Sequence, residues 1–326
     1  MIIRHGQQAG SLIYLGKQAY VHISGNGKWE CPPATIDCLK KFDPHIILIQ
    51  GLIYPFQRIQ LKRMFPHAIM IAQHHGEKVP TGPSKYIYRM AAHFTDAYFF
   101  TAKDNAWPFI ESRLIRKHES VYEVMEASSK INRASSSSLN GISGGKIFLW
   151  VGRLDQNKDP LTAIHAFALH LANYPASWLY MMYTTNQLEI SIRKELEKNE
   201  LLGKQVILLG SQPSSTMAEW YAMADVFISA SHQEGSGYAL LEALHCGCFP
   251  IVTAIPSFCK ITREGEMGWL YPPGDQMALA DLLDKVYRTG LPSQADIIEY
   301  ADRFLSPVSI AKQVYAALQE IHGGLS

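Results

Sequence analysis

The sequence predicts an α/β protein made of two doubly wound domains, and two observations carry this prediction. Short apolar runs alternate with helix-like stretches along almost the whole chain of 326 residues. The apolar runs are nearly continuous, which is typical of parallel strands that are buried on both faces. A stretch rich in Ser and Gly, residues 130–146, interrupts the alternation. It predicts a linker between the domains, with a long surface loop as the alternative.

The first half has a regular part and a less regular opening. Strands are expected at 45–52, 68–76 and 97–102, and helices at 56–65 and 84–94. Before them the pattern indicates two weaker strands, 11–16 and 19–25, and a helix at 33–42.

The second half alternates more cleanly. Strands are expected at 146–152, 177–183, 205–210, 225–231 and 249–254. Helices are expected at 159–174, 187–201, 216–224, 275–289 and 307–322, and a further one begins near Ser236 or Gly237. We therefore expect one domain over 1–140, a second over 146–305, and a C-terminal helix over 306–326 that packs back toward the first. Ligands of such sheets bind at the carboxyl ends of the strands, here in a cleft between the domains.

Composition limits the function classes. The chain is 47% hydrophobic and 18% charged, which is typical of a packed globular protein. It lacks a run of about 20 apolar residues and the layout of a secretory signal. Five irregularly spaced cysteines do not form a disulfide framework, so we expect a cytoplasmic protein with reduced thiols. The aromatic residues show no nucleic-acid stacking pattern.

Charge is distributed unevenly between the halves. Residues 1–145 hold 17 Lys and Arg against 10 Asp and Glu, whereas residues 146–326 hold 13 against 19. A basic half suggests an anionic partner, which includes peripheral contact with the inner face of a membrane. The alternative is a surface with more solvated lysines.

The segment HQEGSGYALLEALHCG, residues 232–247, places Glu234 before a glycine-rich turn and Glu242 inside the following helix. The N–H groups at a helix start and the helix dipole attract anions, and glycines let the backbone approach a phosphate. A carboxylate beside an anion needs another partner, and sugar hydroxyls are suitable donors. Glu242 lies about 9 Å along the helix, a span that fits a ribose joined to a diphosphate. The alternative is a capping acid and a solvated helical glutamate.

A second loop lies at the same predicted sheet edge. Arg153 and Lys158 follow the strand at 146–152 in FLWVGRLDQNKDP. Two cations beside a phosphate site neutralise a diphosphate leaving group without a metal. Alone, such residues are more often surface charges.

Together, VGRLDQNKDPLTAIHAF and EGSGYALLEALHCGCFPIVTAIPSF resemble the donor domain of retaining glycosyltransferases of family 4, which have the GT-B fold and an E-x7-E motif. The resemblance covers 146–305. It implies a retaining, metal-independent hexosyltransferase that uses a nucleotide-diphosphate sugar, needs no cofactor, and acts on a saccharide or lipid-linked acceptor. The first domain would bind the acceptor.

The resemblance also implies roles for particular residues. Glu234 would contact the transferred sugar, Glu242 the ribose, and Arg153 and Lys158 the diphosphate. His75, at the end of IAQHHG, would face the sugar, with His74 as the alternative. The remaining donor-binding positions are Gly152, Gly210, Gly235, Ser236, Gly237 and Tyr238. The family's glycine-rich N-terminal loop is missing from the first domain, which is short, and the nearest stretch, residues 24–29, matches it poorly.

Other groups of residues are less informative. The HCGC segment, 245–248, offers no second ligand pair for zinc, so we expect no metal site there. Lys103 and Asp104 follow a strand and are candidates for acceptor contact or for a capped turn. Two other functions stay open: a sugar-nucleotide epimerase of the same fold, and a non-catalytic sugar-nucleotide-binding protein.

Overall fold

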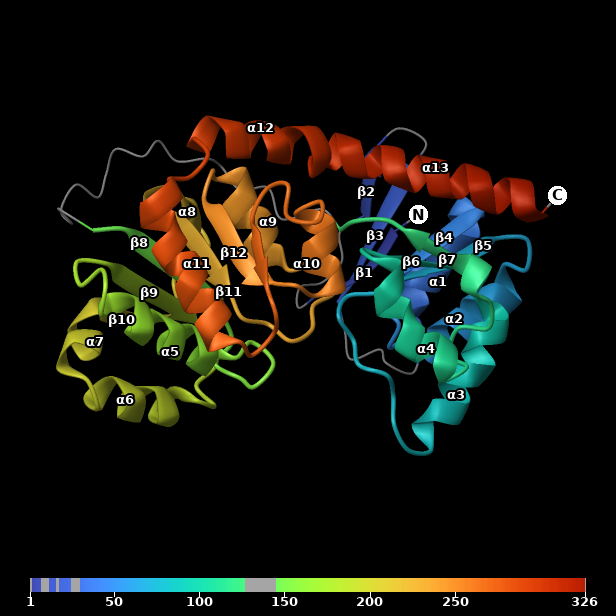
Figure 1. The fold of residues 1–326 in the computed structure, drawn as a ribbon. Coiled ribbons are helices and arrows are strands. Elements are labelled where there is room, and N and C mark those ends of the chain that lie inside the picture. The colour runs from blue at the N-terminus through green and yellow to red at the C-terminus, as the bar shows by residue number, and fades with distance from the viewer. Residues whose placement is uncertain (1, 7–11, 16–17, 25–29, 127–144, 326) are drawn as a thin grey trace. The chain divides into compact units, whose positions relative to one another are not determined.

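The computed structural model describes residues 2–6, 12–15, 18–24, 30–126 and 145–325. The chain divides into two compact units, Met1–Met125 with Ala311–Ser326, and Glu126–Ile310. Most of the predicted linker at 130–146, and of the stretch 24–29, lies outside the described residues. Each unit is built on one sheet with helices packed against it (Figure 1).

Unit 1 contains a seven-stranded sheet in the order β2-β3-β1-β4-β5-β6-β7. All its pairs are parallel except β2 with β3. The sequence pattern predicted neither β1, in which Arg4 and His5 interrupt the apolar residues, nor β7. The strands are β1 (Ile2–Gly6), β2 (Leu12–Leu15), β3 (Gln18–Ser24), β4 (Ile46–Gln50), β5 (Ile69–Gln73), β6 (Ala97–Phe100) and β7 (Val121–Glu123).

The helices of unit 1 include the end of the chain. Ala317 and Ile321 of the last helix pack with Leu48, Ile71 and Phe99 of the sheet in one apolar cluster. The helices are α1 (Pro33–Phe42), α2 (Pro55–Met64), α3 (Ser84–Ala91), α4 (Trp107–Glu111) and α13 (Pro307–Leu325), which enters unit 1 at Ala311. Short 3-10 turns are η1 (Ala92–Phe94), η2 (Lys103–Ala106) and η3 (His118–Ser120).

Unit 2 contains a six-stranded, all-parallel sheet in the order β10-β9-β8-β11-β12-β13. From β8 the chain continues to β9 and then β10 on one side of β8. It then crosses back to β11, which pairs with β8 on the opposite side. This reversal between β8 and β11 is a topological switch point, where doubly wound sheets bind ligands. The strands are β8 (Ile147–Gly152), β9 (Trp178–Tyr183), β10 (Val206–Gly210), β11 (Val226–Ser229), β12 (Phe249–Thr253) and β13 (Trp269–Tyr271).

The helices of unit 2 differ from the prediction at three places. The single helix expected at 187–201 is two helices, because Asn199 is extended and its side chain accepts the Leu202 N–H at 3.1 Å, which starts a new helix. The sequence pattern also did not predict α10 and α12. The helices are α5 (Pro160–Leu171), α6 (Glu189–Glu197), α7 (Glu200–Gln205), α8 (Met217–Met223), α9 (Tyr238–His245), α10 (Pro256–Ile261), α11 (Gln276–Thr289) and α12 (Gln294–Phe304).

A chain of buried polar groups joins α5 to α11, which lie side by side (Figure 1). His170 Nδ1 lies 2.6 Å from Asp284 Oδ1, and its Nε2 lies 2.9 Å from Ser177 Oγ. Asn173 Nδ2 donates to the other Asp284 oxygen at 2.7 Å. Burial lowers the pKa of His170, although Asp284 acts in the opposite direction. The neutral ring donates from Nδ1 and accepts at Nε2, so both nitrogens are satisfied.

We expect Asp284→Ala to lower the free energy of unfolding by about 2 kcal/mol, because the buried His170 ring loses its acceptor and the exposed Asn173 amide loses a hydrogen bond. Urea denaturation followed by circular dichroism measures this loss. Asp281→Ala, on an exposed position of the same helix, should change stability by less than about 0.5 kcal/mol. Equal effects of the two substitutions would show that the buried network contributes nothing.

Candidate functional site

Two loops of unit 2 meet at the carboxyl edge of its sheet. One follows β8 and contains residues 153–159, and the other follows β11 and contains residues 230–237. Because β8 and β11 are parallel neighbours, with Leu149 paired to Phe227, both chains leave the sheet side by side. The sequence-based prediction that these loops share one edge is confirmed.

The two loops are joined by an ion pair, by hydrogen bonds to the backbone, and by the contact of His232 Nε2 with Asp159 Oδ2. Lys158 Nζ pairs with Glu234 Oε1, and both side chains are largely buried. Asn157 Nδ2 donates to the Gln233 carbonyl at 2.9 Å, and the His232 N–H donates to the Asn157 carbonyl at 2.8 Å. Residues 76 positions apart in sequence thus form one structural unit.

Asp155 organises the first of these loops. Its carboxylate accepts from Arg153 Nε at 2.7 Å and from the Lys158 backbone N–H at 2.9 Å. Burial acts to raise the pKa of Asp155, but these hydrogen bonds and the two nearby cations outweigh it and lower the pKa. Asp155 therefore stays ionised and holds Arg153 and Lys158 in the same loop.

The glycine-rich turn leads directly into α9. Gly237 has φ +66° and is the N-cap, so the helix begins at Tyr238, one or two residues later than predicted. A Cβ on Gly237 would lie 2.4 Å from Phe258 Cε1, which leaves space only for glycine. Gly235, Ser236 and Gly237 are buried, whereas Tyr238 is exposed. The positive end of the helix dipole thus lies beside the Lys158–Glu234 pair.

Glu242 lies on α9 and is oriented by a buried tyrosine. Its Oε2 accepts the Tyr221 hydroxyl at 3.2 Å. Burial, together with the Glu242 charge, raises the pKa of Tyr221, so the phenol stays protonated and donates. The two glutamates of the motif are therefore held by different partners, Lys158 for Glu234 and Tyr221 for Glu242.

A third carboxylate lies beneath the turn. Ser236 Oγ donates to Glu126 Oε2, and both residues are buried. No sequence pattern indicates this contact, because the residues are 110 positions apart. Glu126 therefore orients the Ser236 hydroxyl within the turn.

Two predicted glycines have different surroundings. Gly152 ends β8, and a Cβ there would lie 3.0 Å from Trp150 Cη2 and 3.4 Å from Lys158 Cγ. Gly210 ends β10 with φ +66° and open space around it. Since β9 lies between β10 and β8, Gly210 shares the sheet edge but is not brought beside the ion pair.

In unit 1, His74 and His75 follow β5 and have different environments. His74 is 1% exposed and its ring stacks on Phe100 with centroids 4.7 Å apart. His74 Nε2 lies 3.1 Å from the Glu77 carbonyl, and the Gly76 N–H points at Nδ1 at 3.4 Å. Burial lowers the pKa of His74, which keeps the neutral ring suited to both contacts. His75 is half-buried, so it is the more accessible of the two.

The remaining candidates lie in local structure. Lys103 begins the turn η2, and its N–H donates to Glu123 Oε1 at 3.2 Å. In the HCGC segment, His245 Nδ1 contacts the Leu241 carbonyl at 2.7 Å, and both cysteines are buried. Within the described ranges, no cluster of three His, Cys, Asp or Glu is arranged to hold a metal. Across the same ranges, no helix is long and apolar enough to span a membrane.

Two units, each built on a largely parallel sheet with helices packed against it, are the architecture of the GT-B fold, and solved structures agree. Sucrose-phosphate synthase from Thermosynechococcus elongatus has a TM-score of 0.73 at 17% identity, covering 99% of this chain and 89% of that one. Anabaena HepE, solved with UDP, has a TM-score of 0.72 at 16% identity, covering 92% and 86%. The GT-B fold expected from the sequence is confirmed.

The particular family follows from the sequence comparison. The model of glycosyl transferases group 1 matches residues 133–304, and the chain belongs to this family. N-acetyl-alpha-D-glucosaminyl L-malate synthase of Bacillus anthracis is 28% identical over 136 residues, which are 42% of this chain and 34% of that protein. A GDP-mannose:cellobiosyl-diphosphopolyprenol alpha-mannosyltransferase of Xanthomonas campestris is 27% identical over 47% of this chain and 39% of its own length. The chain thus matches little more than a third of these relatives.

Sequence reasoning missed several residues that build the site. Asp155 and Asn157 lie in the segment FLWVGRLDQNKDP. Their position between Arg153 and Lys158 could have indicated that they help to build the site. His232 lies in the second motif, and its Nε2 is 3.0 Å from Asp159 Oδ2. Tyr221 and Glu126 lie in other segments and carry no local signal.

We expect Gly237→Ala to destabilise the protein more than Gly82→Ala, since the two positions share a positive φ, +66° and +67°, but differ in the space around them. Gly82 has nothing within 4 Å of the position that a Cβ would take, so only backbone strain of about 1 kcal/mol applies. At Gly237 the overlap with Phe258 adds about 1–3 kcal/mol. Urea unfolding of both variants measures the difference, and equal losses would contradict the close packing of the turn.

Proposed function

We propose that this protein is a retaining, metal-independent glycosyltransferase of the cytoplasm. It transfers a hexose from a nucleotide-diphosphate sugar to a saccharide or lipid-linked acceptor, in glycan or cell-surface polysaccharide biosynthesis. The observation that carries the proposal is the ion pair between Lys158 and Glu234, beside the start of α9.

The ion pair supplies Lys158 for the phosphate part of a sugar diphosphate and Glu234 for its sugar part. A phosphate oxygen bound to Lys158 takes the ammonium away from Glu234. The released carboxylate then accepts hydrogen bonds from sugar hydroxyls. Arg153 and the turn at Gly235 add positive charge and backbone N–H groups for the phosphates. Glu242, oriented by Tyr221, is placed further along α9 for the ribose.

In the proposed reaction, the acceptor oxygen forms a bond to the anomeric carbon, and the bond from that carbon to the phosphate oxygen breaks. Attack occurs on the face that the diphosphate leaves, which gives retention. The acceptor's proton passes to the leaving phosphate. Arg153 and Lys158 stabilise the negative charge that develops on this phosphate, which is the largest contribution in many enzymes.

Unit 1 supplies the acceptor side in this proposal, and His75 contacts the transferred sugar. His75 is preferred to His74 because His74 is buried with both ring nitrogens engaged in its own loop. The Xanthomonas relative, named for a diphosphopolyprenol substrate, supports a lipid-linked acceptor.

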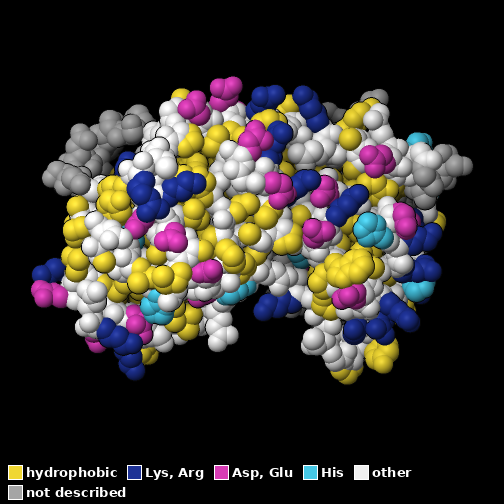
Figure 2. All heavy atoms as spheres, in the orientation of Figure 1, with side chains coloured by type: hydrophobic (Ala, Val, Ile, Leu, Met, Phe, Trp, Pro, Cys, Tyr) yellow, Lys and Arg dark blue, Asp and Glu magenta, His cyan; other side chains and the backbone are white. Residues whose placement is uncertain are grey.

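A surface on α3 supports contact with a lipid-bearing acceptor. Tyr86 and Met90 are one helical turn apart and are 72% and 47% exposed. Lys85 and Arg89 lie on the same short helix, and Figure 2 shows Lys and Arg side chains gathered over this part of unit 1. Apolar residues flanked by cations bind anionic lipid surfaces.

A thermal-shift screen against UDP-glucose, GDP-mannose and ADP-glucose tests the proposal, because a ligand that binds the folded state raises the melting temperature. The best donor is then assayed with and without saccharide acceptors. Release of nucleoside diphosphate with a glycosylated product supports transfer. Conversion of the donor into another sugar nucleotide identifies an epimerase, and binding without turnover identifies a non-catalytic protein.

We expect Glu242→Ala to weaken donor binding about tenfold or more, because a charge-assisted hydrogen bond to the ribose is lost. Glu234→Ala should leave donor binding closer to normal and slow turnover about a hundredfold. Calorimetry and release of nucleoside diphosphate measure the two effects. Glu197→Ala, at an exposed position of α6, is the control. Near-normal values for both site variants would rule out this assignment.

We expect Tyr86→Ser with Met90→Ser to lower co-sedimentation with vesicles of anionic phospholipid about fivefold or more, since two exposed apolar side chains are removed. Ile190→Ser, which replaces a 72% exposed residue of unit 2, should leave it unchanged. Equal sedimentation of all three proteins would show that α3 does not contact lipid.

A further inference from the structure

Two loops of unit 1 lie side by side at the carboxyl edge of its sheet, after β4 and β5. The strands are parallel neighbours, and their last residues, Gln50 and Gln73, are paired in register. The Gly51 N–H donates to the Gln73 carbonyl at 2.8 Å, and Gln50 Nε2 donates to Gln73 Oε1 at 2.9 Å. The loop after β4 leads into α2, and the loop after β5 contains His75.

One carboxylate ties these two loops together. Glu77 Oε1 accepts the Leu52 N–H at 2.8 Å, and Oε2 accepts the His75 N–H at 2.6 Å. The Glu77 side chain is only 13% exposed, so the bonds are shielded from water. Charge-assisted hydrogen bonds of this kind are shorter and stronger than neutral ones. The backbone at His75 is therefore fixed relative to the neighbouring loop.

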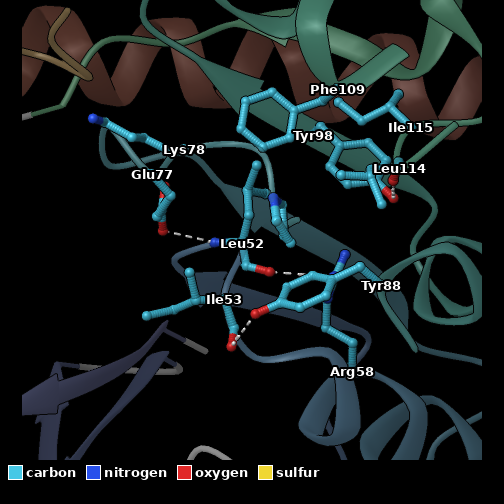
Figure 3. Close-up of a pocket in the computed structure, with 11 residues that line it drawn as sticks. Leu52, Ile53, Arg58, Glu77, Lys78, Tyr88, Tyr98, Phe109, Leu114 and Ile115 are labelled. Atoms are coloured by element: carbon cyan, nitrogen blue, oxygen red, sulfur yellow. Dashed lines mark hydrogen bonds between the residues drawn. The ribbon is translucent and has the colours of Figure 1, made fainter. Parts of the chain in front are cut away.

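A buried cation binds the backbone of the same residue, Leu52, through its carbonyl group. Arg58 of α2, 2% exposed, donates from Nη2 to the Leu52 carbonyl at 3.3 Å and from Nη1 to Thr95 Oγ1 at 3.2 Å. Figure 3 shows Leu52 between the two charges, with its N–H toward Glu77 and its carbonyl toward Arg58. Tyr88 lies beside them and donates to the Ile53 carbonyl at 3.4 Å.

These charges do not form a ligand subsite of their own. The cavity that Leu52, Arg58 and Glu77 line with apolar neighbours has a volume of about 10 Å³, which is room for about one water molecule. It is too small for a sugar or a phosphate. Keeping a guanidinium buried is costly, and its Nε has no hydrogen-bond partner among the described residues. The contacts of Glu77 and Arg58 therefore serve to fix the loops after β4 and β5 relative to each other.

We propose that Glu77 is a positioning residue for the transfer reaction, which holds the His75 loop at the sheet edge by binding the backbone of Leu52, itself bound by Arg58. This inference rests on the proposed function, in which His75 contacts the transferred sugar. Glu77 itself touches neither donor nor acceptor. Its carboxylate acts through the backbone N–H of His75.

The test substitutes Glu77→Gln. The amide keeps the size of the side chain but accepts only one of the two N–H groups. We expect kcat for release of nucleoside diphosphate from the best donor of the UDP-glucose, GDP-mannose and ADP-glucose panel to fall about ten- to a hundredfold, because the His75 loop shifts. KM for the donor should stay within about twofold, since the donor loops belong to unit 2. Glu111→Gln, at an exposed position of α4, is the matched control.

A double-mutant cycle with His75→Ala separates positioning from general damage. If Glu77 acts through His75, Glu77→Gln should change kcat by less than about twofold in the His75→Ala background. If the double variant shows a fall in kcat equal to the product of the two single falls, the positioning role is overturned. An unchanged kcat in Glu77→Gln would overturn it as well. A rise in donor KM equal to the fall in kcat would also overturn it, because that pattern indicates general loss of structure.

The same four proteins distinguish a wrong positioning role for Glu77 from a wrong proposed function. Wild-type kcat in His75→Ala, or a wild-type protein without turnover, would refute the role of His75 and with it the positioning role. A slow His75→Ala with a fully active Glu77→Gln would refute the positioning role alone. Should Glu77→Gln fail to fold, Glu77→Asp, whose shorter side chain reaches one N–H group, replaces it under the same criteria.

Discussion

The ion pair between Lys158 and Glu234 is the interaction on which the candidate site depends. It joins the loops after β8 and β11, which parallel pairing brings to one edge of the sheet. Asp155 fixes the cation loop from within, and the packing of Gly237 against Phe258 fixes the turn that carries Glu234. The two loops are therefore held together in one defined geometry at the sheet edge.

Both predicted phosphate-binding cations of this site already have an acidic partner. Arg153 pairs with Asp155 and Lys158 with Glu234, so a simple anion must compete with a carboxylate for each. A ligand that carries both an anion and hydroxyl groups has a lower free-energy cost of binding. Its anion binds the cation, and its hydroxyl groups donate hydrogen bonds to the displaced carboxylate. In the proposed function, this balance would favour a sugar diphosphate over free phosphate and would tie specificity to both parts of one molecule.

In both units, side chains bind backbone groups and so hold neighbouring loops together at the sheet edge. In unit 2, groups of one loop bind the backbone of the other, as Asn157 does with Gln233. In unit 1, the Glu77 carboxylate binds the N–H groups of Leu52 and His75. Loops that follow parallel strands have unpaired backbone groups near the sheet edge. Side chains that satisfy those groups also fix the loops, so the functional edge is rigid without further secondary structure.

The sequence alone determined two largely parallel sheets, because nearly continuous apolar runs mark buried strands. It also determined the family, through its motifs, and the loops that carry Arg153, Lys158 and Glu234, because the ends of parallel strands share one edge. Only the tertiary structure decided which groups pair. Glu234 and Lys158 are 76 positions apart, and Ser236 and Glu126 are 110 apart. It also separated the buried His74 from the accessible His75. The reason is physical: a hydrogen bond or ion pair forms between groups that the strand order brings within about 3 Å, and no local pattern encodes that distance.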